Sequence, residues 1–496
     1  MDRMTFMTLL PKVTIALFIF IYGACIGSLV NVLVYRLPRG LGIVTPPSRC
    51  PTCDHKLSWR ENIPVFGWLL LRGKCRFCQQ RISPEYPIVE AFVGLLFLTV
   101  YLLFYALPET AGYPLHIGTD LLQPEWASNG LAATWPELLV VCVLLACLVA
   151  ITLIDARTAQ IPLILVWVPV VVALLFYTGH AIWIQIFHGG PATINPGQGW
   201  KLADGTRWNT APGAIWSIPT PGLIGWRMLG VAIGGSIGLI VAIILMQLGL
   251  IRRSFDDYDQ WEKEALAQAQ AERLAKENPS REAAPVGTPE PESEQSEDSQ
   301  APELETEREP SAEDADFWIQ YPYARREMFK EIAFLAPPVA FGVFGMWLAP
   351  KIVEWTAGPP QLDLFTSQMI PAAEIPLWLS VFAGVLLGYL IGGAVVWGVR
   401  ILGSLAFGKE ALGMGDVHLV AAIGASIGWI DAVLGFFGAA FVGLGWTLFA
   451  AIFSGKVGRT LPYGPYIAIA TVLVFLGKPG VEWFLSRLMG APINLP

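Results

Sequence analysis

Charged side chains are scarce in this chain of 496 residues. They make up 15% of it, against 54% hydrophobic residues, and the mean hydropathy is +0.53. Soluble globular domains carry about 25% charged residues, so the scarcity excludes an ordinary soluble protein. Apolar runs long enough to cross a bilayer recur instead. The composition therefore predicts an all-α polytopic membrane protein, a helical bundle of about eight to ten spans. We expect spans at residues 13–35, 87–107, 136–154, 161–184, 226–250, 331–350, 376–402, 417–430, 433–453 and 464–485.

The first apolar run lacks the small-residue cleavage site of a signal peptide, so we expect it to remain as a span. Lys and Arg are absent from residues 108–135, whereas residues 36–86 hold nine Lys/Arg and three Asp/Glu. Cytoplasmic loops are enriched in Lys and Arg. We therefore expect 36–86 in the cytoplasm and 108–135 on the other side. Each further span takes the chain to the opposite face, so counting spans from there places Asp155, 251–330 and 413–416 at the cytoplasmic face.

Aromatic residues and positive charge are sparse between residues 254 and 317. This segment holds 20 acidic and five basic side chains and is rich in Glu, Pro, Ala and Ser. Such a composition cannot bury enough apolar surface to fold. It predicts a disordered acidic linker within residues 251–330, and the rest of the chain is net basic.

Cysteine is also infrequent, with seven residues, but four of them share one polar loop. Cys50-Pro-Thr-Cys53 and Cys75-Arg-Phe-Cys78 are separated by 21 residues. Two such knuckles bring four thiolates to one tetrahedral metal, most often zinc, and a site filled by four thiolates is structural. The alternatives are two unrelated reduced pairs or redox-active dithiols. We expect zinc at Cys50, Cys53, Cys75 and Cys78.

Two aspartates lie at the edges of predicted spans, where a carboxylate is costly and usually functional. Asp155 ends one apolar run, and Asp416 follows Gly413-Met-Gly415 at the start of another. Both are expected at the same membrane face. Two neighbouring carboxylates can share a proton, so that one acts as base and the other as acid. The pattern predicts an aspartyl hydrolase, in which the glycines permit a substrate strand to approach closely.

The motifs around these aspartates resemble those of type IV prepilin peptidases. The similarity covers residues 20–178 and 380–475. It is carried by the following segments: Gly27 to Pro38, the two cysteine knuckles, Tyr86-Pro-Ile-Val-Glu90, Asp155 to Pro162, Gly408 to Asp416, and Pro462-Tyr-Gly-Pro465.

This resemblance implies a prepilin leader peptidase with Asp155 and Asp416 as catalytic pair, followed by N-methylation with S-adenosylmethionine. It implies type IV prepilins or pseudopilins as substrates and the bacterial inner membrane as location, with the active site facing the cytoplasm. Membrane lipid is the other expected partner, and no nucleic acid is expected. A soluble glycine-rich methyltransferase fingerprint is absent, so the cofactor site is implied by the resemblance alone.

Other candidate site residues surround the aspartates and the cysteine loop. Gly413, Gly415 and His418 are expected to support the second aspartate; the family has Lys where this chain has His418. Glu90 is either a site residue or an interfacial carboxylate paired with an arginine. Asn31 and Arg36 are candidates for binding the methyl-donor cofactor or for holding the cysteine loop.

These observations predict a linear organisation. The expected parts are a first span (1–35), a cytoplasmic zinc loop with four cysteine ligands (36–86), helices with the first aspartate (87–185), a periplasmic loop (186–225), an extra span (226–250), the acidic linker (251–330), an extra span and loop (331–375), and helices with the Gly-x-Gly-Asp motif (376–496).

Three other functions remain open. A peptidase without methyltransferase activity fits the same motifs. A proton-coupled transporter would place its aspartates near mid-span and leaves the cysteine loop unexplained. A scaffold protein recruiting partners through the acidic linker would tolerate replacement of either aspartate.

Overall fold

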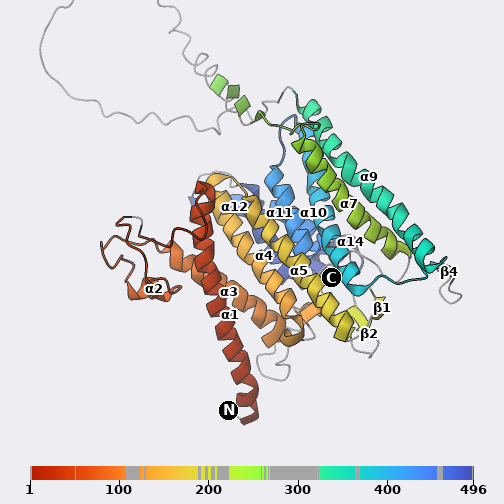
Figure 1. Ribbon diagram of the computed structural model, residues 1–496. Helices are drawn as coiled ribbons and strands as arrows, with labels where there is room; N and C mark the ends of the chain where they lie inside the picture. Colours follow the sequence, from red (N-terminus) through yellow and green to blue (C-terminus); the bar gives the residue numbers. More distant parts are fainter. Residues whose placement is uncertain are drawn as a thin grey trace, which may run out of the picture. The chain divides into compact units, whose positions relative to one another are not determined.

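A computed structural model gives the fold of most of the chain (Figure 1). It describes residues 3–50, 52–107, 123–127, 130–187, 191–195, 199–202, 207–208, 223–258, 260–261, 264–265, 267–268, 321, 323–362, 369–454, 462–493 and 495.

Within these residues, eight helices are long and apolar enough to cross a bilayer. This confirms the prediction of an α-helical polytopic membrane protein. They are α1 (Arg3–Arg36), α3 (Glu85–Tyr101) with its π-helical continuation η2 (Leu102–Ala106), α4 (Leu131–Thr158), α5 (Leu163–Phe187), α7 (Leu223–Gln247), α9 (Ala324–Ala357), α10 (Leu377–Phe407) and α12 (Trp429–Ser454).

Two of the expected spans are not single helices that cross the bilayer. The predicted span 417–430 is the 14-residue α11 (Met414–Ile427), which at 1.5 Å per residue covers about 21 Å, less than the bilayer core. The predicted span 464–485 is a pair, α13 (Tyr463–Leu476) and α14 (Lys478–Met489), bent by 92°. Pro479 lies at the start of α14, and a proline cannot continue the preceding helix.

The remaining elements are short. They are η1 (Leu37–Arg39), α2 (Phe66–Leu70), η5 (Glu125–Ala127), an antiparallel sheet of β1 (Pro191–Asn195), β2 (Gly199–Leu202) and β3 (Arg207–Trp208), and a hairpin of β4 (Gln361–Leu362) and β5 (Met369–Ile370). The three-stranded sheet lies within the predicted periplasmic loop.

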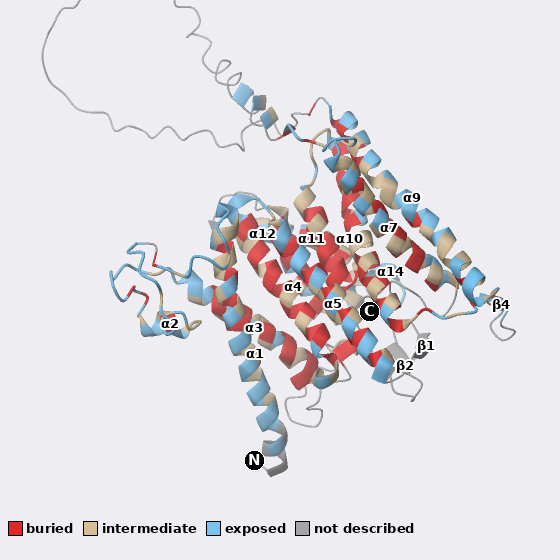
Figure 2. Ribbon diagram, in the orientation of Figure 1, coloured by how far each residue is buried: buried red, intermediate tan, exposed pale blue. Residues whose placement is uncertain are grey.

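The chain forms two compact units. The first comprises residues 1–244, 335–399 and 413–496, and the second comprises 245–334 and 400–412. In the first, α4 is the central helix: it contacts α1, α3, α5, α11 and α13, and its side chains are buried along most of its length (Figure 2). In the last turn of α4, Asp155 is buried, whereas Ala156, Arg157 and Thr158 are exposed.

The second unit has its own small core of aromatic side chains. Phe255, Tyr258 and Tyr321 are buried in it, and the rings of Trp261 and Tyr321 are 4.9 Å apart. The two ends of the predicted acidic linker, residues 251–330, thus meet in this core and are ordered there. Residues 269–320, the rest of the segment predicted to be disordered, lie outside the described residues.

Candidate functional site

Asp155 lies in the last turn of α4 and is 3% exposed. Its carboxylate faces the backbone of Gly464 at the start of α13. The Gly464 backbone hydrogen-bonds to it, and a Cβ atom on Gly464 would collide with Asp155 Oδ2. The helix ends at Thr158. The next residue, Ala159, adopts a left-handed conformation (φ 51°) and donates its N–H to the Asp155 carbonyl. The chain then turns toward α5.

Asp416 lies in the first turn of α11 and is also buried. Gly413 precedes the helix in an extended conformation, and the Asp416 N–H donates to its carbonyl at 3.2 Å. The positive end of the helix dipole favours a negative charge at this position. Asp416 is close enough to Tyr463, the first residue of α13, for their charges to interact.

The two aspartate motifs meet at the start of α13. Asp155 faces Gly464, and Gly415, next to Asp416, faces Ile161. Ile161, in the first motif, contacts the other two segments: a Cβ on Gly415 would be 3.1 Å from Ile161 Cβ, and one on Gly464 would be 3.4 Å from Ile161 Cδ1. Three segments far apart in sequence therefore lie together, and both aspartates are buried there.

Tyr463, Gly464 and Ile161 were not among the predicted site residues. A signal for them existed, because Ile161 lies inside the first aspartate motif and Tyr463-Gly464 inside the Pro-Tyr-Gly-Pro segment. Their apolar and glycine character gave no chemical reason to select them.

His418 lies one turn into α11, beyond Asp416. Its Nδ1 is 3.4 Å from the hydroxyl of Tyr389 on α10, and the Tyr389 ring stacks on Trp167 of α5 at 5.5 Å. This histidine thus links α11 to aromatic side chains of two neighbouring helices. No pattern in the sequence connects Tyr389 or Trp167 to it.

The four cysteines of the loop form one cluster, and their Sγ atoms all lie within 4.8 Å of one another. Cys50 Sγ is 3.7 Å from Cys78 Sγ, and Cys53 Sγ is 4.0 Å from Cys75 Sγ. A disulfide requires about 2.05 Å. Tetrahedral zinc–thiolate bonds of about 2.3 Å place two sulfurs roughly 3.8 Å apart. The cluster therefore has the dimensions of a metal site.

The two knuckles share one backbone geometry. Asp54 donates its N–H to the Cys50 carbonyl at 2.9 Å, and Gln79 donates to the Cys75 carbonyl at 3.0 Å. Asp54 and Gln79 both have positive φ, 53° and 57°. Backbone N–H groups of the first knuckle lower the pKa of the Cys50 thiol to about 6, whereas the pKa of the neighbouring Cys53 thiol is raised to about 12, so the two thiols differ in how readily they ionise without a metal.

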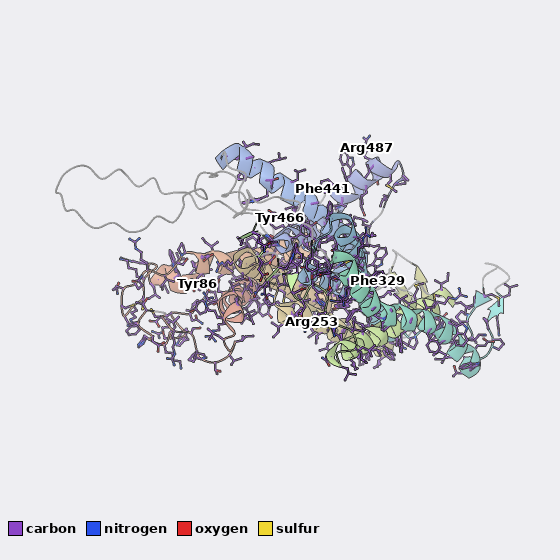
Figure 3. The ribbon with its side chains drawn as sticks, turned by 90° about the horizontal axis from the view of Figure 1, so that it is seen from above. Tyr86, Arg253, Phe329, Phe441, Tyr466 and Arg487 are labelled. Carbon is purple, nitrogen blue, oxygen red and sulfur yellow. The ribbon has the colours of Figure 1, made fainter. Side chains whose placement is uncertain are left out.

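Glu90 and Arg36 hold the cysteine loop on the membrane helices, and Asn31 joins α1 to α3. Glu90 on α3 accepts the Val65 N–H at 2.7 Å. Asn31 donates to the carbonyl of Tyr86, labelled in Figure 3, at 3.0 Å. Arg36 donates to the carbonyls of Gly42 and Ile43, both at 2.9 Å, and to that of Pro46 at 2.7 Å. The donor groups of Asn31 and Arg36 thus bind the chain's own backbone.

Comparison with known proteins identifies the amino-terminal part of the chain. The model of the bacterial peptidase A24 N-terminal domain matches residues 21–104. The prepilin leader peptidase/N-methyltransferase of Myxococcus xanthus (strain DK1622) is 52% identical over 82 residues, which cover 16% of this chain and 24% of the relative. The protein of that name from Klebsiella pneumoniae is 35% identical over 151 residues, which cover 29% of this chain and 54% of the relative.

A third relative, the type 4 prepilin-like proteins leader peptide-processing enzyme of Escherichia coli O78:H11, is 35% identical over 100 residues, 16% of this chain and 37% of the relative. The chain thus spans between about a quarter and about half of the length of these relatives. No solved structure gave a significant match. Residues 21–104, which include the four cysteines and Glu90, match the model of the bacterial peptidase A24 N-terminal domain, and the chain is similar to prepilin leader peptidases/N-methyltransferases over part of their length.

Proposed function

We propose that this chain is a membrane aspartyl peptidase that removes the basic leader from type IV prepilins or pseudopilins. The observation that carries the proposal is the meeting of the two aspartate motifs at the start of α13. The relatives' names supply the substrate class. A transporter relay near mid-span is not favoured, since both aspartates lie in terminal turns of their helices.

In the proposed mechanism, Asp155 and Asp416 share one proton. The ionised carboxylate takes a proton from the attacking water, while the protonated one donates to the carbonyl oxygen of the scissile peptide. The pair titrates as a unit. The N-terminal end of α11 stabilises its negative charge, and burial strengthens every electrostatic interaction within the site.

The site would act at the cytoplasmic face of the bacterial inner membrane. The basic loop 36–86 and the basic residues flanking 254–317 support this orientation. A leader peptide would then be cut where it emerges from the membrane, close to the carboxylate pair. The same charge pattern supports the division of the chain into the parts predicted from its sequence.

The four-cysteine cluster is proposed to bind one structural zinc ion. Its sulfur–sulfur distances and the repeated knuckle geometry support this. A bound zinc would cross-link the two halves of the loop, and with four thiolate ligands it leaves no position for substrate.

N-methylation of the new amino terminus with S-adenosylmethionine is proposed from the relatives' names. The cofactor would supply the methyl group. Asn31 and Arg36 are the candidates for holding the cofactor, beside the backbone carbonyls that they bind.

The direct test is to incubate the purified full chain with a prepilin in lipid and analyse the product by mass spectrometry. We expect cleavage at one site after the basic leader and, with S-adenosylmethionine present, a mass increase of one methyl group. An uncut prepilin would refute the peptidase. A cut but unmethylated product would favour a peptidase alone.

A further inference from the structure

A buried arginine lies at the end of α10, in the second unit. The side chain of Arg400 is 2% exposed, yet it carries a full charge. Its Nε donates to Glu331 Oε1 at 2.9 Å, and its NH1 group donates to Glu410 Oε1 at 2.6 Å. NH1 also donates to the carbonyl of Leu412. One guanidinium thus binds two carboxylates and a backbone carbonyl at once.

Residues 186–375, here called the insertion because they lie between the two segments of family similarity, include side chains that hold this arginine in place. Glu331 belongs to α9, one of the two helices without counterpart in the family motifs. The Ser254 hydroxyl donates to Glu331 Oε1 at 2.8 Å, which orients the carboxylate. The ring of Phe255 lies 5.5 Å from the Arg400 guanidinium carbon, within the range of a cation–π interaction. The insertion therefore supplies one carboxylate that accepts from Arg400, that of Glu331, and one aromatic ring beside its guanidinium, that of Phe255.

The other partners of Arg400 lie in the segment leading to the second aspartate. Leu412 directly precedes Gly413, and Asp416 follows four residues after Leu412. The same segment is held twice more: the Ala411 N–H donates to Ser404 Oγ at 3.2 Å, and the Gly408 carbonyl accepts the Tyr321 N–H at 2.7 Å. Gly413 alone lies between this segment and α11, whose first turn carries Asp416. The position of the segment therefore bears on where α11 begins.

We propose that Arg400 is a positioning residue for Asp416. The insertion is required for this positioning, because it supplies Glu331. The proposal rests on the proposed peptidase function. The planar guanidinium holds Glu410 and the Leu412 carbonyl in fixed geometry, and Glu331 sets the rotamer of the arginine. Loss of either side chain releases the turn that carries Asp416.

The test compares Glu331→Gln, Arg400→Gln and Arg400→Lys in the full chain, with prepilin cleavage measured over a range of substrate concentrations. A displacement of about 1 Å in a catalytic group costs roughly 100-fold in rate. We expect kcat to fall by about 100-fold in the first two variants while KM stays within about twofold, because the substrate still binds. Arg400→Lys keeps the positive charge but lacks the planar guanidinium with its several N–H donors. Its kcat should therefore lie between those of Arg400→Gln and the unchanged chain.

Glu327→Gln is the matched control. Glu327 is as buried as Glu331 and lies one turn earlier on α9. Its partners are Lys330, at 2.6 Å, and the Phe255 N–H, at 2.8 Å. We expect this variant to lose thermal stability and to keep a kcat close to that of the unchanged chain.

Two outcomes overturn the inference: a kcat near normal in Glu331→Gln, or an equal loss of kcat in Glu327→Gln, which would show a general effect on folding. Asp416→Asn and the unchanged chain are assayed alongside. Failure of the unchanged chain to cleave, or normal cleavage by Asp416→Asn, would refute the proposed function instead.

Discussion

The backbone of Gly464 lies directly against the carboxylate of Asp155, and no side chain fits between them. The contact joins the last turn of α4 to the first turn of α13. It explains why a glycine stands at this position in a helix, where alanine would ordinarily be more stable.

Gly464→Ala should therefore impair the proposed prepilin cleavage without unfolding the chain. The new methyl group would push the Asp155 carboxylate away, and we expect a kcat about 100-fold lower. Prepilin cleavage and a thermal melt measure the two effects. Gly179→Ala on α5 is the control, since a Cβ there meets nothing within 4 Å. Full activity of Gly464→Ala would contradict the placement of Asp155.

The cysteine cluster should hold one metal ion per chain. Cys75→Ala removes a buried ligand, and we expect zinc to be lost and residues 36–86 to become sensitive to protease. Cys142→Ala removes a buried cysteine outside the cluster and should retain the metal. Metal analysis of the purified proteins checks both. An unchanged zinc content in Cys75→Ala would exclude the four-thiolate site.

Glu90 should anchor the cysteine loop without taking part in peptide cleavage. Glu90→Ala leaves the Val65 N–H without its acceptor, at a cost of about 1–3 kcal/mol. We expect faster proteolysis of the loop and a nearly unchanged kcat. Glu61→Ala is a control within the loop, since Glu61 binds Ser58 rather than a membrane helix. A large fall in kcat for Glu90→Ala would place Glu90 in the catalytic site.

The acidic linker should be dispensable for cleavage. Because Trp261 and Tyr321 already meet, deleting residues 265–312 leaves the aromatic core and the Arg400 cluster with all their members. We expect normal kcat and KM from a chain that inserts normally. Loss of activity in such a chain would show that the linker acts in the reaction.

Hydropathy and motif spacing were sufficient to predict the helical membrane fold and the grouping of the four cysteines. Both depend on local sequence: apolar run length in one case, and the short knuckle spacing in the other. The break between α13 and α14 was missed although Pro479 marks it, because the apolar run continues on both sides.

Long-range contacts could not be predicted from the sequence. The approach of Gly464 to Asp155 joins residues more than 300 positions apart, and the burial of Arg400 against Glu331 depends on how α9 packs. A lone arginine at the end of an apolar run is equally typical of a cytoplasmic flank. Only the packing of the folded chain distinguishes a buried, ion-paired arginine from one at a cytoplasmic flank.

The central claim is that Asp155 and Asp416 act as one catalytic pair. Its most direct test is single-turnover cleavage of a prepilin by Asp155→Asn and by Asp416→Asn, with Asp431→Asn as control. Asp431 is also buried but pairs with Lys478 at 3.0 Å. The account predicts that both pair variants lose cleavage, by at least about 1,000-fold, while the control keeps it. Cleavage at the normal rate by either pair variant would contradict it.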